Sequence, residues 1–299
     1  MTDYGRPLAF GFFLNPNAAD YPGLVEVARL VDDLGLDLIG IQDHPYQSTF
    51  LDTWTLLTAI ATLTRRVSVF PDVANLPLRP PAVLAKAAAS LDVMSGGRVE
   101  LGLGAGGFWD AIAAMGGPRR EPRDAVAALE EAIAVIRLMW SGQRSVRVEG
   151  RFYSLHGVHP GPAPAHPIGL WIGATGPRML DLIGRRADGW IPSSSYVPPD
   201  KLPDMNARID AAAASAGRDP AAIRRLYNVV GRITDGPSSG FLDGPVDQWV
   251  DELTALAVAQ GMDSYILGVD GPPEDQLRRF ALEVVPRVRE NVARHRMTS

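Results

Sequence analysis

Short apolar runs alternate with amphipathic segments along most of the chain, a pattern typical of α/β proteins. The clearest apolar run covers residues 36–41 and ends in Gln42, Asp43, His44 and Pro45. Such a run, bounded by turn-forming residues, predicts a buried strand. Because α/β proteins place their chemistry at the carboxyl ends of buried strands, Asp43 and His44 are the first candidate site residues.

The same criterion predicts seven further strands, and helices separate them. The other predicted strands cover residues 8–13, 67–73, 99–103, 168–172, 188–192, 226–233 and 264–267. Predicted helices with one apolar face cover residues 21–34, 53–63, 80–94, 123–140, 177–187, 199–216 and 245–259, and a last one begins near Pro273. Eight strands, each followed by a helix, predict an α/β fold of the (β/α)8 TIM-barrel type; a doubly wound sheet is the main alternative.

The regular alternation is interrupted once, after the fourth predicted strand. A short extra helix is predicted at residues 108–115, and residues 145–155 alternate as in a hairpin. Residues 156–167 are rich in proline and glycine. Because this region carries no core of its own, we predict a single domain over residues 1–299 with an enlarged insertion region at 106–167.

Composition and charge narrow the possible function classes. The chain has 29 basic and 34 acidic residues and a net charge of −5, without the basic stripe that a nucleic-acid partner requires. It has no cysteine, which excludes disulfides, thiolate metal ligands and cysteine nucleophiles. His156, His159 and His166 fit no ligand spacing and have no carboxylate beside them in the sequence, so no metal site is expected. Neither a signal peptide nor a run of membrane-spanning length is present, so we expect a cytoplasmic protein without a membrane partner.

Two turns of small residues follow predicted strands and supply candidate binding residues. Residues 102–107 match the pattern G-x-G-x-x-G, but a glycine-rich run matches it easily, and Phe108 and Trp109 follow in place of a long helix. Residues 173–178 open a helix, where free backbone N–H groups and Arg178 would hold an anion. Both turns are alternatively explained as tight connections that need glycine only for their geometry. In a barrel, however, two such turns at strand carboxyl ends can converge on one site.

Taken together, these residues resemble the bacterial luciferase-like superfamily of flavin- and deazaflavin-dependent oxidoreductases. The resemblance is carried by residues 40–44, 73–86, 91–106, 173–178 and 187–190. It implies a TIM barrel with insertions, in agreement with the strand count. It also implies coenzyme F420 or FMN bound without a covalent link in the barrel mouth, a non-proline cis peptide at Asp72-Val73, and a homodimer.

The resemblance also assigns roles to individual residues. His44 matches the catalytic or substrate-facing histidine, which can pass a proton while hydride moves, and Asp43 would orient it or contact the ring. The pair could instead be a polar cap of the strand. The residues expected to contact the cofactor are Asp72, Val73, Ala74, Gly104, Ala105, Gly106, Gly107, Ala174, Thr175, Gly176, Pro177 and Arg178. The residues expected to face the substrate are Tyr46, Phe108, Trp109 and Trp190.

The resulting hypothesis is an oxidoreductase that transfers hydride between coenzyme F420 or FMN and a small organic substrate. The Asp43-His44 pair favours F420. The alternative is an FMN-dependent monooxygenase that uses O2 and a separate flavin reductase as partner. From other classes, a non-catalytic flavin-binding homologue would bind the cofactor without needing His44, and an aldolase or isomerase fits least because neither Lys86 nor Lys201 lies at a strand end. Residues 46–52, 108–120 and 234–244 are expected to set substrate identity.

Overall fold

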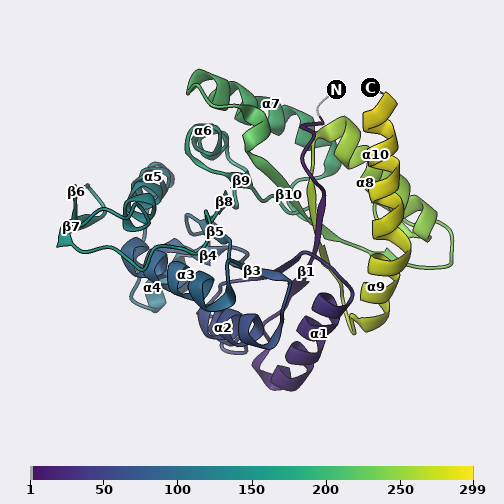
Figure 1. The fold of residues 1–299 in the computed structure, drawn as a ribbon, viewed down its shortest axis with the longest axis horizontal. Coiled ribbons are helices and arrows are strands. Elements are labelled where there is room, and N and C mark those ends of the chain that lie inside the picture. Colours follow the sequence, from purple (N-terminus) through teal and green to yellow (C-terminus); the bar gives the residue numbers. More distant parts are fainter. Residues whose placement is uncertain (1–2, 299) are drawn as a thin grey trace.

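The computed structural model describes residues 3–298 and shows a barrel of parallel strands surrounded by helices (Figure 1). The barrel segments are β1 (Ala9–Leu14), β2 (Leu38–Ile41), β3 (Ser68–Pro71), β4 (Ala74–Asn75), β5 (Leu101–Gly104), β8 (Leu170–Ile172), β9 (Gly189–Trp190), β10 (Arg224–Val230) and β13 (Ser264–Gly268). Their hydrogen-bonded order is β3-β2-β1-β13-β10-β9-β8-β5-β4, and every pairing is parallel.

The sheet closes on itself through its third strand, which is divided into two pieces. β3 pairs with β2, whereas β4 pairs with β5. β3 is also joined to the segment that leads into β5. The Val69 amide donates to Arg98 O at 2.9 Å, and the Glu100 amide donates to Val69 O at 3.1 Å. Counting β3 and β4 as one strand leaves eight in a closed cylinder, so the predicted TIM barrel is confirmed over the described residues and the doubly wound alternative is wrong.

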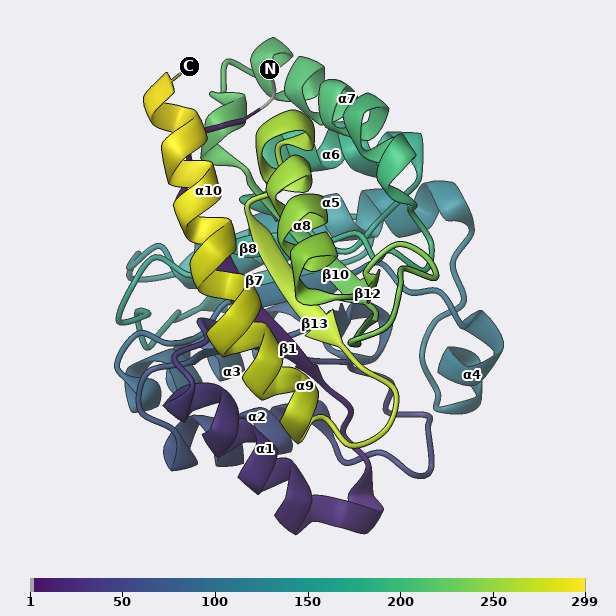
Figure 2. The ribbon, with the colours of Figure 1, turned by 90° about the vertical axis from the view of Figure 1, so that its right-hand side faces the viewer.

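The predicted helices form the outer ring, which Figure 2 shows from the side of the last two helices. They are α1 (Tyr21–Asp33), α2 (Thr53–Leu63), α3 (Pro81–Ser95), α5 (Pro122–Met139), α6 (Pro177–Arg186), α7 (Leu202–Ser215), α8 (Val246–Gln260), α9 (Glu274–Arg279) and α10 (Val285–Thr298). The terminal helix expected from near Pro273 is present as a continuous helical stretch, in which the π-helical segment Phe280–Val284 joins α9 to α10.

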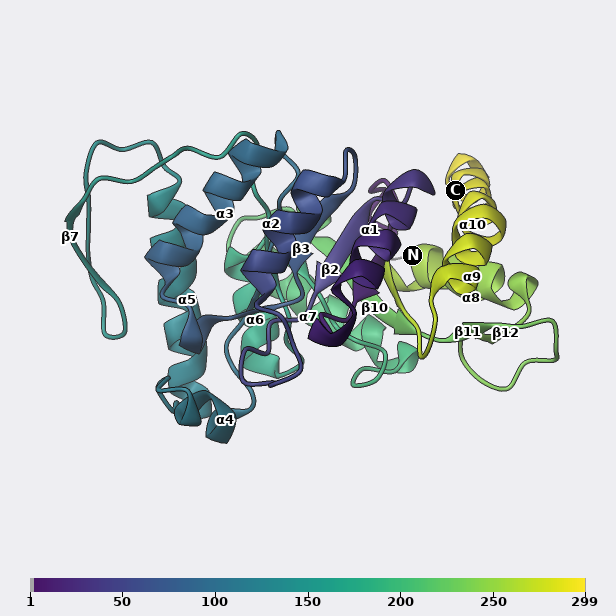
Figure 3. The same ribbon diagram turned by 90° about the horizontal axis from the view of Figure 1, so that it is seen from below.

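The insertion after β5 contains the two predicted extra elements. α4 (Trp109–Ala114) lies at the carboxyl end of the barrel, and β6 (Val146–Glu149) pairs antiparallel with β7 (Ser154–Val158). Figure 3 shows this hairpin extending away from the barrel beyond α5. A smaller parallel pair, β11 (Arg232–Ile233) with β12 (Asp243–Gly244), follows β10, so the expected strand 226–233 ends earlier than predicted.

Apolar side chains fill the barrel interior up to about the middle of the strands. This inner cluster consists of Ala9, Leu38, Phe70, Trp171, Ile191, Leu226 and Ile266. The larger core lies between the strands and the helices and draws on residues from Phe10 to Val292. Because the inner cluster plugs the cylinder, a ligand entering from the carboxyl end reaches only the rim above it.

Buried polar groups fix the loops at the other end of the barrel. The Asp32 carboxylate accepts the backbone N–H groups of Arg65, Arg66 and Val67 at 2.7–2.9 Å. These bonds anchor the start of the third strand to α1. Within residues 3–298, no helix combines the length and apolar character needed to cross a bilayer.

Candidate active site

The candidate residues from the sequence gather at the carboxyl rim because the barrel strands are parallel. Asp43 and His44 follow β2, the bond between Asp72 and Val73 separates β3 from β4, and the two small-residue turns follow β5 and β8. The carboxyl ends of parallel strands meet at one end of a barrel, so these segments share one rim.

The peptide bond between Asp72 and Val73 is cis, as the resemblance implied. Glycines on neighbouring strands make room for the Val73 side chain at this bend. A Cβ placed on Gly104 would lie 2.7 Å from Val73 Cγ2, and one placed on Gly102 or Gly173 would lie 3.1 Å from Val73 Cγ1. The glycines of β5 therefore serve the geometry of the bend. Ala74 has no exposed surface and packs in the larger core between the strands and the helices. This burial corrects the expectation that Ala74 contacts a cofactor.

Asp43 is bound by an arginine that the sequence analysis did not single out. Arg79 Nε donates to Asp43 Oδ2 at 2.6 Å, and Arg79 Nη2 donates to Asp43 Oδ1 at 2.7 Å. The Asn75 amide donates to the same carboxylate at 2.8 Å, and Arg79 also bonds Asp52 at 2.7 Å. Asp43 is 1% exposed. Its hydrogen bonds to Asn75 and Arg79 join the loop after β2 to the end of β4 and the segment that follows it. The only signal for this role was the position of Arg79 within the stretch 73–86.

His44 lies in a cluster of aromatic rings at the rim. Its ring stacks on Tyr46 with centroids 5.4 Å apart and meets Phe108 edge-on, also at 5.4 Å. Phe108 is 58% exposed, whereas His44 and Tyr46 are half-buried. Burial lowers the pKa of His44, and the nearby Asp43 charge opposes this only in part, so the imidazole is neutral at pH 7. A neutral, partly accessible imidazole can accept a proton from a bound molecule.

The turn after β5 is held by an aromatic residue. Gly106 has a φ of 104°, which favours glycine, and a Cβ there would lie 2.7 Å from the Trp109 ring and 2.8 Å from Pro77. Ala105 is 8% exposed, and Gly107 has open space around its Cα. Trp109 therefore packs beneath the turn, with part of its surface at the rim.

The turn after β8 leads into α6, where the first N–H groups have no partner within the helix. Thr175, Gly176, Pro177 and Arg178 are exposed, and Ala174 is half-buried. Pro177 is the first residue of α6, so the amides of the following residues are oriented along the helix axis. This turn, with the Arg178 guanidinium, has the groups needed to hold a phosphate.

Trp190 does not lie where the sequence analysis expected. It has no exposed surface, packs in the outer core, and donates its indole N–H to Ala174 O at 2.8 Å. Its role is to hold the turn after β8 and not to line the mouth. The physical reason is strand alternation: Ile191 points into the barrel, so Trp190 faces the helices.

Three buried polar atoms at the rim have no hydrogen-bond partner among the described residues. They are Asp72 Oδ2, Asn75 Oδ1 and Asn228 Oδ1. Asp72 follows β3, Asn75 ends β4, and Asn228 lies in the second half of β10. Buried polar groups are normally satisfied, so this group of atoms fits a site for a polar ligand. Asn228 could have been found from the sequence as a polar residue within the apolar run 226–233.

Residues 3–298 contain no cluster of three or more His, Asp or Glu that could hold a metal ion. The fold brings two carboxylates to His166, although none stands beside it in the sequence. The His166 Nδ1 lies 2.8 Å from Asp92 Oδ1, and its Nε2 lies 3.7 Å from Glu100 Oε1. The Asp92 carboxylate also accepts the His166 amide, so this histidine anchors the proline-rich loop.

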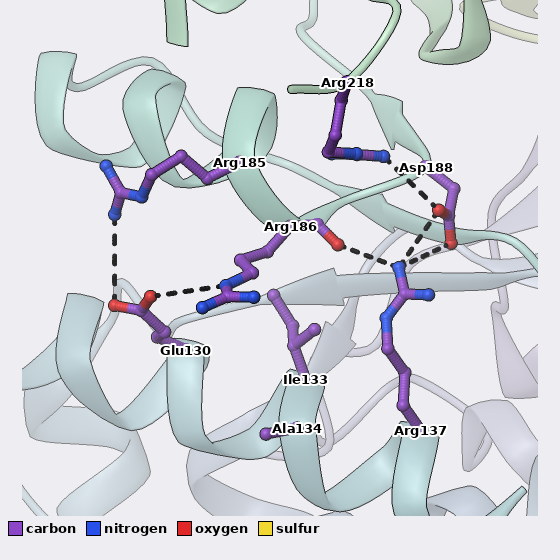
Figure 4. A pocket seen from close by; sticks show the side chains of 8 residues that line it. All are labelled: Glu130, Ile133, Ala134, Arg137, Arg185, Arg186, Asp188 and Arg218. Carbon is purple, nitrogen blue, oxygen red and sulfur yellow. Dashed lines mark hydrogen bonds and ion pairs between the residues drawn. The ribbon is translucent and has the colours of Figure 1, made fainter. Parts of the chain in front are cut away.

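Two cavities lie away from the rim, near the amino ends of the strands. One, of about 440 Å³, lies between α5, α6 and β9 (Figure 4). Its arginines are all engaged: Arg137 and Arg218 pair with Asp188, and Arg185 and Arg186 face Glu130. The other, of about 750 Å³, lies at the amino mouth of the barrel. Because most of its lining residues precede the strands or lie at their first positions, this cavity is on the opposite side of the inner cluster from His44.

Comparison with known proteins places the chain in a family. Residues 8–237 match the family model described as luciferase-like monooxygenase. The chain belongs to this family. The F420-dependent glucose-6-phosphate dehydrogenase of Gordonia bronchialis is 30% identical over 233 residues, covering 75% of this chain and 68% of that protein. The F420-dependent hydroxymycolic acid dehydrogenase of Mycobacterium tuberculosis is 33% identical over 220 residues, covering 70% of this chain and 59% of that protein.

Solved structures of the luciferase-like fold agree with the barrel described above. An F420-dependent secondary alcohol dehydrogenase in complex with an F420-acetone adduct superposes with a TM-score of 0.84 at 18% identity, covering 95% of this chain and 99% of the other. The F420-dependent tetrahydromethanopterin reductase of Methanopyrus kandleri has a TM-score of 0.81 at 19% identity, covering 95% and 100%. At these identities the likeness concerns the fold.

Proposed function

We propose that this member of the luciferase-like family is an F420-dependent oxidoreductase that transfers hydride between the deazaflavin and a small organic substrate. The observation that carries the proposal is the rim itself, where a half-buried histidine with a lowered pKa and a helix start suited to an anion lie at one end of the barrel. The names of the relatives, F420-dependent dehydrogenases, support F420 over FMN.

The residues of the rim divide the work of binding. The bend at Asp72-Val73 would lie beside a planar ring, and the glycines at positions 102, 104 and 173 leave room for the Val73 side chain there. The start of α6 and Arg178 would hold the phosphate of the cofactor. Coenzyme F420, when bound, supplies a ring carbon that accepts or gives a hydride.

His44 provides the proton chemistry of the proposed reaction. As the neutral imidazole, His44 accepts the proton of a substrate hydroxyl while hydride leaves the carbon that carries this hydroxyl. In the reverse direction it returns the proton to the oxygen. Both oxygens of Asp43 accept hydrogen bonds from Arg79, and Asp43 acts on the His44 ring through its charge, which opposes the lowering of the His44 pKa. It also fixes the backbone that carries His44, while Tyr46 and Phe108 exclude water from one side of the imidazole.

Titration of the purified protein with F420 and with FMN tests the proposal. We expect saturable binding of F420. We also expect that an alcohol or sugar-phosphate donor reduces the bound F420 and that this reaction does not need O2. His44→Ala should lose this turnover and keep the cofactor. Binding of FMN but not of F420, with O2 consumption once the FMN is supplied in its reduced form, would instead favour the monooxygenase with its separate reductase. Cofactor binding without turnover of any donor would favour the non-catalytic homologue.

We further propose that the protein acts in the cytoplasm as a homodimer that contacts through α2 and α3. Val83, Ala87, Ser90 and Met94 follow one another at helical spacing on the outer side of α3, and Val83 and Met94 are 66% and 62% exposed. A surface of small and apolar residues on adjacent helices suits close helix packing between two copies. Light scattering should give a dimer mass for the wild type and a monomer mass for Val83→Glu combined with Met94→Glu.

A further inference from the structure

Asp72 is a carboxylic acid placed inside the barrel at the cis peptide. Its amide donates to Ile41 O at 2.7 Å, which ties it to β2. Its side chain lies against Gly40, where a Cβ would come within 3.1 Å of Asp72 Oδ2 and 2.8 Å of Phe70 Cζ. Since Phe70 and Leu38 belong to the inner cluster, Gly40 faces the interior, and the Asp72 carboxyl therefore lies on top of the apolar plug.

The surroundings of this carboxyl contain one polar partner. The side chain of Asn228, on β10, lies close enough to the Asp72 carboxyl to oppose the rise of its pKa. The Asn228 amide oxygen has no hydrogen-bond partner among the described residues. The carboxyl oxygen Oδ2 of Asp72 is likewise buried and without a partner there, although Asp72 as a whole is partly exposed.

No cation compensates the carboxyl in the described part of the chain. Burial raises the pKa of Asp72 to about 7, and the nearby Asn228 amide opposes the rise only in part. β2 contributes Gly40 and a backbone carbonyl, β3 contributes Phe70, and β10 contributes Asn228, none of which titrates. Arg79 is engaged by Asp43 and Asp52, as described above, so it is not the counter-ion of Asp72.

The apolar surroundings of this carboxyl favour the neutral acid over the carboxylate. A buried carboxylate without a cation or a donor at Oδ2 carries the full cost of an uncompensated charge, whereas the neutral acid costs less to bury and needs one acceptor. We propose that Asp72 is a ligand-facing acid, protonated in the complex, whose Oδ2–H donates a hydrogen bond to an acceptor atom of the ring bound over the cis peptide. This inference rests on the proposed function for the identity of the ring.

The inference predicts that cofactor affinity depends on pH in a defined direction. Only the protonated acid can donate, so affinity falls as the pH rises through the Asp72 pKa. Because one proton is involved, the dissociation constant should increase by about tenfold per pH unit above that pKa. His44 does not produce the same slope, because burial lowers its pKa and its titration lies on the acid side.

The experiment measures the dissociation constant of F420 by fluorescence between about pH 6 and about pH 9, the range that brackets the raised pKa. Asp72→Asn keeps an N–H donor of the same shape and cannot titrate, so its affinity should stay near the low-pH wild-type value throughout. Asp72→Val has no donor, so its affinity should be weak and independent of pH. His44→Gln is the matched control and should keep the wild-type slope. A pH-independent wild type, or an unchanged slope in Asp72→Asn, would overturn the inference.

A second measurement separates this inference from the proposed function. Infrared spectra of the free wild-type protein should show a protonated carboxyl band that disappears near neutral pH and is missing in Asp72→Asn. If F420 binds without the slope, the inference fails while the proposed function stands. If F420 does not bind, the proposed function fails, and the same pH series with FMN decides the role of Asp72; binding of neither cofactor overturns both.

Discussion

Replacement of Arg79 by methionine tests the ion pair that holds the loop of His44. Methionine keeps most of the volume of the arginine stem but removes both hydrogen bonds to Asp43. The Asp43 side chain has no exposed surface and that of Arg79 is 19% exposed, so the carboxylate would be left buried with only the Asn75 amide. Removing one partner of such a pair costs about 3–5 kcal/mol, because the remaining charge is uncompensated.

Two control variants isolate this cause. Asp52→Asn removes the second ion pair of Arg79, but the Asp52 side chain is 46% exposed and asparagine still caps α2, so the loss should be about 0–1 kcal/mol. Combining Arg79→Met with Asp43→Asn replaces the buried charge by a neutral amide that still accepts from Asn75. The double variant should therefore be more stable than Arg79→Met alone.

Urea denaturation followed by circular dichroism gives the unfolding free energies, and F420 titration reports on the site. We expect Arg79→Met to lose cofactor affinity together with stability. If Arg79→Met unfolds within about 0.5 kcal/mol of the wild type, or if the double variant is less stable than Arg79→Met, the buried pair is not what holds this loop.

Three further outcomes are expected. His44→Ala should lose turnover with F420 affinity retained, and the wild-type kcat/KM should fall as the pH falls through the lowered His44 pKa, below about 6.5; a flat pH profile would argue against His44 as the base. Gly40→Ala places a methyl group 2.8 Å from Phe70 Cζ and should cost about 1–3 kcal/mol in chemical denaturation, whereas an unchanged midpoint would mean that the ring shifts freely. Burial alone would raise the pKa of Asp32, but three backbone N–H groups outweigh it and hold the pKa below its usual range. Asp32→Ala should therefore cost about 1–3 kcal/mol at pH 7, and the difference from the wild type should shrink as the pH falls below about 4; a difference that persists in acid would contradict this.

Local patterns in the sequence were sufficient for the elements and their order. The apolar run at 36–41 predicted β2, and the amphipathic segment 53–63 has the bounds of α2. These predictions succeed because strand and helix periodicity and capping act over a few residues. Their alternation, counted along the chain, predicted the closed barrel and therefore the rim at which His44 lies.

Side-chain partners and orientations required the tertiary structure. Arg79 pairs with Asp43 across 36 positions of sequence, and Asp92 meets His166 across 74. The cis peptide was expected from the resemblance, but the glycines beside Val73 come from β5 and from the turn after β8.

The amino-acid sequence by itself determined the eight strands, their helices and the residues at the strand ends, because these follow from short-range patterns of polarity. Only the tertiary structure decided that Trp190 faces the helices and that the Asp72 carboxyl lies in the barrel with one oxygen unpartnered. Which groups a side chain meets depends on the closure of the cylinder and on the register between strands, and neither is encoded within a few neighbouring residues.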